Sequence, residues 1–288
     1  MILYAVYRVG HFITLSLPRS FTYWLGSRIA DIVFILNYKT RRLIIANLTH
    51  ALGNDNDRIR ACARKILRNF AKYLVEFLRF EKMGKEYIEK NVKIEGVENV
   101  RGALKSGKGV IAFSAHLGNW EWGAALLAQL GFPISVIALA HENKHVNDFF
   151  ISQRAIKGVK NIPLGGSVRK TMELLKKNEL IGILSDRDFS DNSVRINFFG
   201  KPAVMPVGIG LFAVKCKCPI LPVFIMRQKD NTYKYVLEKP LEYTLTGNKD
   251  ADIRTVVQKA TNAIEKYIKL YPEQWYMFDD PWKNVSGR

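Results

Sequence analysis

The sequence predicts an α/β fold in which helices flank a mixed β-sheet and a helical extension precedes the sheet. Three observations predict it. Short apolar runs bounded by turn residues alternate with amphipathic stretches through the middle of the chain. Helical periodicity dominates the first ninety residues. Finally, 48% of the 288 residues are hydrophobic, which is enough for a substantial core and excludes a disordered protein.

The first fifty residues combine apolar and cationic side chains. Arg8 and His11 interrupt the opening apolar run and Pro18 follows, so no unbroken stretch of about 20 apolar residues is present. A second apolar run, 29–36, is too short to cross a bilayer. Asp31 is the only acid up to residue 50. We therefore expect residues 1–50 to form helices that associate with a membrane, although ordinary helices packed on the core would also fit the pattern.

The remaining elements follow in the order of a single α/β domain, residues 51–288. Gly131 is expected to close one helix, Ser167 to cap another and Pro206 to stand in the first turn of a third. Asp230-Asn231 marks a turn between two strands. The spacing of apolar residues predicts helices at 57–80, 97–105, 120–131, 143–158, 168–177, 206–217 and 250–270, and strands at 92–95, 109–115, 133–140, 180–186, 219–228 and 233–243.

The net charge of the chain indicates which classes of molecule to expect as binding partners. Lys and Arg number 44 and Asp and Glu 26, which gives a formal net charge of +18. Such a charge favours nucleic acid, an anionic membrane surface or a phosphorylated substrate. No nucleic-acid-binding motif is present, so no nucleic acid is expected as a partner. Three cysteines are too few for a disulfide scaffold.

Three segments resemble known functional motifs, but the sequence around each one argues against that function. The segment 102–109 resembles a phosphate-binding loop, but it lacks the Ser or Thr that holds magnesium and it precedes a strand. His141 and His145 match the HExxH zinc pattern, yet the motif straddles a strand end and a helix start, so the two rings should not share a helix face. Cys216 and Cys218 stand too close together for a zinc pair. No metal site is expected.

The strongest functional segment is His116-Leu-Gly-Asn119-Trp-Glu121. His116 follows a buried strand, where α/β proteins bind their ligands, and Glu121 lies in the first turn of the next helix. A carboxylate that accepts from one imidazole nitrogen leaves the other nitrogen basic toward a hydroxyl group. The spacing therefore predicts a His–Glu pair for general base catalysis, with a capping Glu and a structural His as the alternative.

This segment resembles the HX4D/E motif of the glycerolipid acyltransferase superfamily. More narrowly, the chain resembles the lipid A biosynthesis lauroyl/myristoyl acyltransferases. Further segments agree with that family in the same order along nearly the whole chain: 41–48, 51–53, 143–154, 184–188, 197–203, 219–224 and 272–278.

The resemblance implies a fold like that of the glycerolipid acyltransferases, and a role for each matching residue. His116 is the expected general base and Glu121 its orienter. Arg154, Asp186 and Arg187 are expected at the substrate, together with Asn119. Arg154 suits a substrate phosphate, because a guanidinium forks onto phosphate oxygens. Arg187 would neutralise Asp186 or meet a phosphate.

The resemblance thus implies an enzyme of lipid A and lipopolysaccharide biosynthesis. It would move a fatty acyl group from an acyl thioester, either acyl carrier protein or coenzyme A, to a hydroxyl of a membrane glycolipid, with no other cofactor. Its expected place is the cytoplasmic face of the bacterial inner membrane, monotopic or peripheral, with a single span as the alternative. Two other functions stay open: acylation of a phospholipid or phosphatidylinositol mannoside, and non-catalytic binding of anionic lipid.

Overall fold

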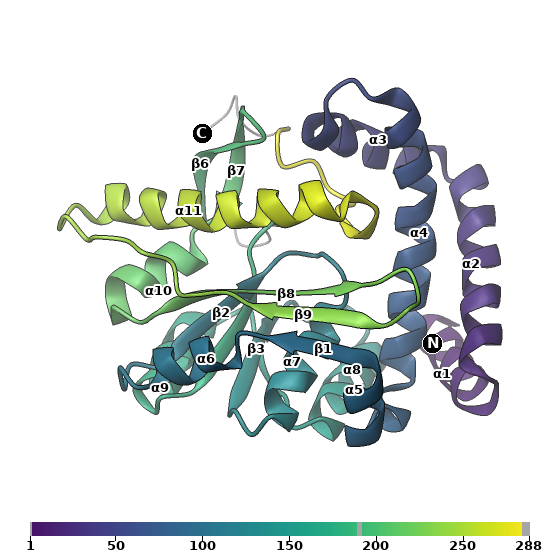
Figure 1. Ribbon diagram of the computed structural model, residues 1–288, viewed down its shortest axis with the longest axis horizontal. Coiled ribbons are helices and arrows are strands. Elements are labelled where there is room, and N and C mark those ends of the chain that lie inside the picture. Colours follow the sequence, from purple (N-terminus) through teal and green to yellow (C-terminus); the bar gives the residue numbers. More distant parts are fainter. Residues whose placement is uncertain (1, 189–191, 284–288) are drawn as a thin grey trace.

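A computed structural model describes residues 2–188 and 192–283 of the chain. The two expected domains begin at residue 1 and end at residue 288. Met1 and residues 284–288 lie outside the described residues. The mixed α/β architecture predicted from the sequence is confirmed (Figure 1).

Seven strands form the main sheet, in the order β1-β9-β8-β2-β5-β3-β4. The pair β8–β9 is antiparallel and all other neighbours are parallel, so the sheet is mixed. The turn around Asp230-Asn231 joins the antiparallel pair, as expected. The strands are β1 (Val92–Glu95), β2 (Val110–Ser114), β3 (Ile134–Ala138), β4 (Lys160–Pro163), β5 (Leu180–Leu184), β8 (Ile220–Arg227) and β9 (Tyr233–Leu237).

Helices cover both faces of this sheet, and the alternation of side chains along β2 shows why. Ile111 and Phe113 pack with α9 (Ser167–Lys176), α10 (Gly208–Cys216) and α11 (Lys249–Leu270). Val110, which points to the opposite face, packs with α6 (Val97–Leu104), α7 (Trp120–Gln129) and α8 (Lys144–Ile156). Because both faces are buried, the central strands are continuously apolar in sequence.

Four helices at the amino-terminal end pack beside the sheet (Figure 1): α1 (Ile2–Ser16), α2 (Arg19–Leu36), α3 (Tyr38–Leu52) and α4 (Asn56–Leu78). Pro18 separates α1 from α2, which confirms the expected helix pair. In α2, Tyr23, Ala30 and Asp31 are buried against α4, so this helix carries a core-facing side as well as an exposed apolar side. Within the described residues, no helix has both the length and the apolar character that a bilayer crossing demands.

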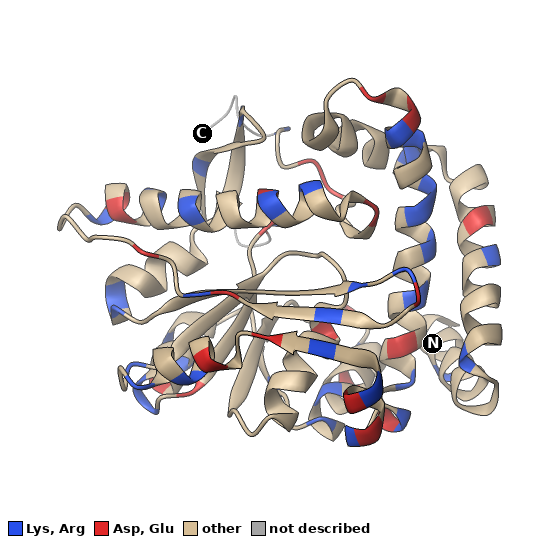
Figure 2. Cartoon of the chain, in the orientation of Figure 1, with Lys and Arg blue, Asp and Glu red and all other residues tan. Residues whose placement is uncertain are grey.

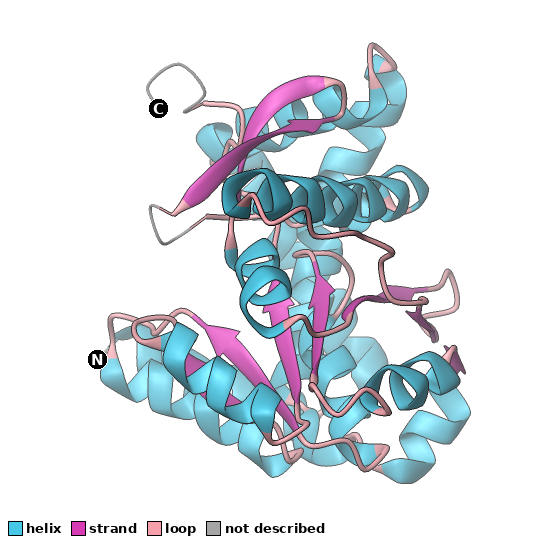
Figure 3. Cartoon of the chain, turned by 90° about the vertical axis from the view of Figure 1, so that its left-hand side faces the viewer, coloured by secondary structure: helices cyan, strands magenta, loops and turns pink. Residues whose placement is uncertain are grey.

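Several elements differ from the expectation. The ribbon of β6 (Ser193–Phe198) and β7 (Lys201–Pro206) was not predicted; it lies on α11, away from the main sheet (Figure 3). Strand β4, helix α5 (Lys85–Asn91) and the short 3-10 turns at 80–82 and 272–274 were also missed. Pro206 ends β7, and α10 starts only at Gly208. Gly166 rather than Ser167 holds the N-cap position of α9, because glycine adopts the left-handed conformation found there, with φ of 82°.

Candidate active site

His116 and Asp186 meet because their two strands are neighbours in the same register. In the parallel pair β2–β5, Ser114 lies opposite Leu184. The chain runs on for two residues beyond the end of each strand. The backbone N–H of Ser185 donates to the carbonyl of Ser114 over 3.0 Å. His116 and Asp186 therefore emerge side by side at the carboxyl edge of the sheet, the edge at which α/β proteins bind ligands.

The Asp186 carboxylate is fully buried and makes four hydrogen-bond contacts. It lies 2.8 Å from Nδ1 of His116, accepts from the backbone N–H of His116 with both oxygens at 3.1 and 3.0 Å, and accepts from Nε1 of Trp275 at 3.1 Å. Burial alone would raise the pKa of Asp186, but the charge and hydrogen bonds of His116 and the indole N–H hold that pKa below its usual value. An ionised carboxylate can only accept, so in the neutral imidazole Nδ1 carries the proton and Nε2 keeps its lone pair.

The expected His116–Glu121 pair is thereby corrected: the carboxylate on the imidazole is Asp186. Glu121 instead receives the fork of Arg154, with Nε at 2.8 Å and Nη2 at 2.6 Å. The remaining guanidinium nitrogen, Nη1, donates to Asn161 over 2.9 Å. Glu121 stands in the first turn of α7 and Arg154 in the last turn of α8, so the pair ties these two helices together.

The structure also places the two remaining predicted residues. The Asn119 side chain is fully buried and is not among the described residues that line the pocket below. It accepts from the N–H of Trp122 as the N-cap of α7 and donates to Glu76, so its position does not fit a direct substrate contact. Arg187 lines the pocket but pairs with Asp279 rather than Asp186.

A pocket of about 1340 Å³ opens onto this edge of the sheet. It reaches His116, Glu121, Arg154 and Arg187 at its polar end, and apolar side chains form most of the rest. The apolar walls include Leu127, Ile134, Val136, Phe150, Leu211 and Ile225. The pocket therefore joins polar groups beside the imidazole to a mostly apolar wall, and a second set of charged residues also lines it: Arg169, Glu173, Lys176, Lys249 and Asp250.

A row of small residues creates room on the α7 side of the sheet. Ala112 lies opposite Gly182, and Gly182 lies opposite Val136, in three adjacent strands. All three line the pocket, as do Gly123 and Ala124 of α7. Two residues away on the same face of these strands, large side chains fill the neighbouring core. The small residues leave the pocket open beside them. Small residues inside otherwise bulky strands are the sequence signal that could have indicated this space.

The HExxH match lies in the expected context. Strand β3 ends at Ala138 and α8 begins at Lys144, so the motif does straddle a strand end and a helix start. The His141 ring packs on Phe150 and the His145 ring on Tyr4. Among the described residues, no three His, Cys, Asp or Glu side chains are grouped as metal ligands.

Comparison with known proteins supplies independent findings. Residues 1–284 match a family model described as bacterial lipid A biosynthesis acyltransferase. A phosphatidylinositol mannoside acyltransferase of Mycolicibacterium smegmatis is 24% identical over 245 residues, which is 82% of this chain and 77% of that protein. Two Mycobacterium tuberculosis strains have proteins of the same description, 24% and 23% identical over 222 residues, covering 75% of this chain and 68% of each relative.

Proposed function

The chain belongs to the bacterial lipid A biosynthesis acyltransferase family and is an acyltransferase, and from that premise we propose that it moves a fatty acyl group from a thioester to a hydroxyl group of a membrane glycolipid. The observation that carries this proposal is the pair of His116 and buried Asp186 at the polar end of a long apolar pocket. Such a pocket suits a substrate that joins a polar reacting group to a hydrocarbon chain.

The chemistry follows from the protonation of the pair. Nε2 of His116 takes the proton of the acceptor hydroxyl, and the hydroxyl oxygen attacks the thioester carbonyl carbon. The tetrahedral intermediate collapses with cleavage of the C–S bond, and the departing thiolate takes the proton from the imidazolium. The products are an ester and a free thiol. Asp186 keeps its charge throughout, holds the ring in one tautomer and stabilises the transient imidazolium.

The pair of Glu121 and Arg154 serves this site as part of its wall. The Glu121 carboxylate accepts two N–H groups from Arg154 and is almost completely buried, so it is not the base in this proposal. Arg154 lines the pocket with its charge largely balanced by Glu121. Arg187, which also lines the pocket, pairs with Asp279 and is about one fifth exposed, so it is a second candidate cation for an acceptor phosphate.

Two acceptors are candidates. The description of the family model favours a lipid A precursor, whereas the description of the relatives favours a phosphatidylinositol mannoside. The thioester is carried either by acyl carrier protein or by coenzyme A. No further cofactor enters the proposed reaction.

The proposed location is the cytoplasmic face of the inner membrane, without a span. Exposed large apolar side chains gather on the two first helices: Ile2, Leu3, Val6, Val9 and Phe12 on α1, and Phe21, Trp24, Ile29, Ile32, Val33, Ile35 and Leu36 on α2. Lys and Arg residues recur along α4, the helix on which α2 packs (Figure 2). Apolar surface next to cationic surface is typical of proteins that lie on anionic lipid.

One assay tests the function. Purified protein is incubated with thioesters of both carriers and with lipid A precursors and phosphatidylinositol mannosides, and product masses are recorded. We expect one acceptor to gain an acyl group, and His116→Ala to lower kcat by about 10²–10⁴-fold while the protein stays folded. Binding of the lipids without any acylated product would support the non-catalytic alternative, and near-normal turnover by His116→Ala would exclude this imidazole as the base.

A further inference from the structure

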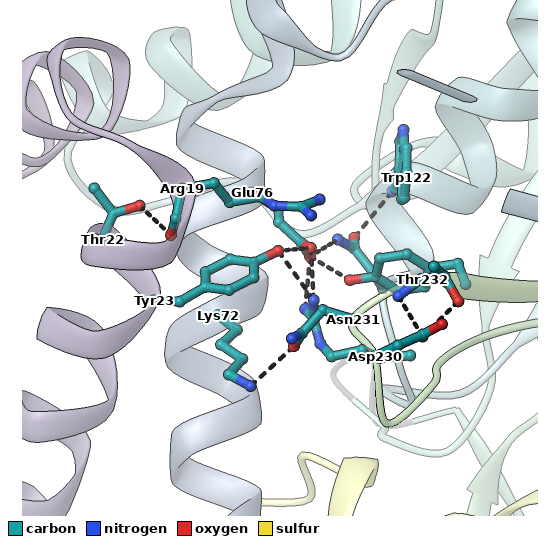
Figure 4. Close-up of polar contacts among 12 residues, drawn as sticks. Arg19, Thr22, Tyr23, Lys72, Glu76, Trp122, Asp230, Asn231 and Thr232 are labelled. Atoms are coloured by element: carbon teal, nitrogen blue, oxygen red, sulfur yellow. Dashed lines mark hydrogen bonds and ion pairs between the residues drawn. The ribbon is translucent and has the colours of Figure 1, made fainter. Parts of the chain in front are cut away.

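The buried Glu76 carboxylate lies outside the pocket. It joins α2, one of the two proposed lipid-facing helices, to the loop that carries His116. Glu76 of α4 is 1% exposed and accepts hydrogen bonds from four different parts of the fold. Asn119 donates to Oε2 over 2.8 Å, and Arg227 donates to both oxygens over 2.6 and 2.7 Å. The hydroxyls of Tyr23 on α2 and Tyr233 on β9 are the other two donors. Figure 4 shows Tyr23 and Glu76 pointing toward one another between the two helices.

This carboxylate is ionised. Burial would raise the pKa of Glu76, but the positive charge of Arg227 and the hydrogen bonds of its donors lower that pKa below its usual value. A buried ion pair contributes little to stability on balance, because desolvation of both charges offsets most of their attraction. A role in holding specific neighbours in place accounts better for such a network.

The first of those neighbours is Asn119, three residues after His116. One Asn119 side chain both caps α7, by accepting from the N–H of Trp122 over 3.1 Å, and donates to Glu76. The turn between His116 and Asn119 passes through Gly118, whose φ is 67°. A Cβ atom there would stand 1.8 Å from the carbonyl oxygen of Ile225, so the turn is packed tightly on β8. Asn119 thus fixes the far end of the loop that carries the imidazole.

The second neighbour is Arg227, which is linked to the His116–Asp186 pair through Gln274. Its backbone N–H donates to the side chain of Gln274 over 2.9 Å, and the Gln274 amide donates back to its carbonyl over 2.8 Å. The Gln274 carbonyl accepts from the N–H of Gly118 over 3.0 Å. The next residue, Trp275, donates to Asp186. Both partners of the catalytic pair are therefore linked to groups that Glu76 holds.

We propose that Glu76 is a positioning residue for the His116–Asp186 pair, acting through Asn119 and Arg227. This inference rests on the proposed function. Because Glu76 lies outside the pocket-lining residues that the structure describes, it acts on the geometry of the imidazole and not on substrate binding. Tyr23 makes the same carboxylate the point at which α2 is attached to the active-site loop.

The test separates the two roles of Asn119, which are its hydrogen bond to Glu76 and its place as the N-cap of α7. Asn119→Ser and Asn119→Asp both keep an oxygen that caps α7. An ionised Asp has no donor for Glu76, and the Ser O–H lies one bond closer to the backbone than the amide nitrogen, so it falls short of Glu76. Asn119→Asp also sets a second carboxylate beside Glu76, so it should do more damage than Asn119→Ser. Asn99→Ser is the matched control, because Asn99 also ties a helix to the sheet, by donating to the carbonyl of Leu237, far from this loop in the hydrogen-bond network.

We expect Asn119→Ser to lower kcat by about 10–100-fold with KM nearly unchanged, because small misplacements of a catalytic group cost rates of this order. Nitrogen-15 NMR of the His116 ring, with His116→Gln for assignment among the five histidines, should show altered ring signals in Asn119→Ser and unaltered signals in Asn99→Ser. Glu76→Gln should resemble Asn119→Ser if it folds.

The ring signals are read without turnover, so this test stands apart from the test of function. A folded Asn119→Ser protein with unaltered ring signals and full kcat would overturn the positioning role. Altered ring signals in Asn119→Ser, together with an active His116→Ala enzyme, would keep the positioning of the ring and reject its catalytic role.

Discussion

Asp186 is the residue whose charge should decide the rate. Asp186→Asn keeps the shape of the side chain but lets an amide donate to Nδ1, which would place the proton on Nε2 and remove the base. We expect kcat to fall by about 10²–10⁴-fold with little change in KM. Steady-state kinetics checks this, with Asp230→Asn as the control, since Asp230 only accepts from Thr232 in an exposed turn. An unchanged kcat would show that His116 needs no carboxylate partner.

Glu121 and Arg154 should behave as one unit in folding. Removal of either partner leaves the other charge buried, so Glu121→Gln and Arg154→Met are each expected to lower the free energy of unfolding by about 3–5 kcal/mol. The double variant should cost clearly less than the sum of the two. Urea denaturation at pH 7 measures all three proteins, and additive losses would mean that the fork seen at 2.6 and 2.8 Å does not persist in solution.

The residue types of this site were predictable from sequence, but their pairing was not. His116, Glu121, Arg154 and Arg187 all line the pocket, which agrees with their selection as site residues. Spacing alone favoured the acid five residues away as the partner of His116. The actual partner lies 70 residues away, and only the register of β2 against β5 brings it there. Long-range strand pairing leaves no mark in local spacing.

At the scale of elements, Asp31 is a second acid, besides Glu76, that attaches α2 to α4. Asp31 accepts from Arg64 over 2.9 Å and from Arg68 over 2.7 Å, and pairs with Arg28 at 3.1 Å. Hydrogen bonds from Arg68 and Arg64 hold the pKa of Asp31 well below its usual value. A carboxyl with such a lowered pKa stabilises the folded chain above the unfolded pKa of about 4 and loses this contribution as the pH falls toward the folded pKa.

Asp31→Asn should therefore lower the free energy of unfolding by about 1–3 kcal/mol at pH 7. The difference from the parent protein should shrink as the pH is lowered from 4 toward 2. Thermal or urea unfolding at a series of pH values measures this, with Asp57→Asn, on the exposed start of α4, as the control. A difference that grows on acidification would contradict the ionised pair.

The wall that α7 gives to the pocket should set the length of acyl chain. Ala124 lines the pocket, and Ala124→Phe would fill part of its volume. We expect the ratio of kcat/KM for long over short acyl thioesters to fall about tenfold or more, because even one methylene group changes binding in an apolar pocket measurably. Ala124→Ser, which changes little in size, is the control. An equal loss for all chain lengths would mean that this wall does not contact the acyl chain.

Elements with strong apolar periodicity were predictable, and those that depend on partners were not. The long helix α4 and most buried strands of the sheet were found within a few residues of their ends, but β9 ends at Leu237 and the expected strand ran to residue 243. The β6–β7 ribbon was missed although residues 193–198 alternate polar and apolar side chains, and it packs on α11 rather than in the main sheet. Strand β4 was missed because it is four residues long and takes its place from pairing with β3.

At the scale of the whole molecule, the exposed apolar face of α1 and α2 should govern attachment to lipid. Phe12→Ser combined with Trp24→Ser is expected to weaken partition onto anionic vesicles by about 10²-fold, since each buried aromatic contributes about 1.5–3 kcal/mol. High salt should weaken binding further without abolishing it. Vesicle sedimentation measures this, with Leu130→Ser, at the exposed C-cap of α7, as the control.

Substitution is a better test of this face than deletion of the first 36 residues. Tyr23 and Ala30 are buried against α4, and Tyr23 also reaches Glu76, so removal of α2 would expose the core and disturb the site. Unaltered vesicle binding by the double variant would locate lipid attachment elsewhere. Equal loss with Leu130→Ser would point to a general effect of apolar surface.

The segment that completes the active site is synthesised long after the proposed lipid-facing helices. Trp275 donates to Asp186, and Tyr276 donates its N–H to the carbonyl of His116 over 2.7 Å, whereas the proposed lipid-facing helices end at Leu36. Roughly 240 residues separate the two, which a ribosome takes about 10–50 s to translate at 5–20 residues per second. The helices thus leave the ribosome tens of seconds before the pair can close. A nascent chain would reach the bilayer while still inactive, and acyl transfer would begin only on chains already at their lipid surface.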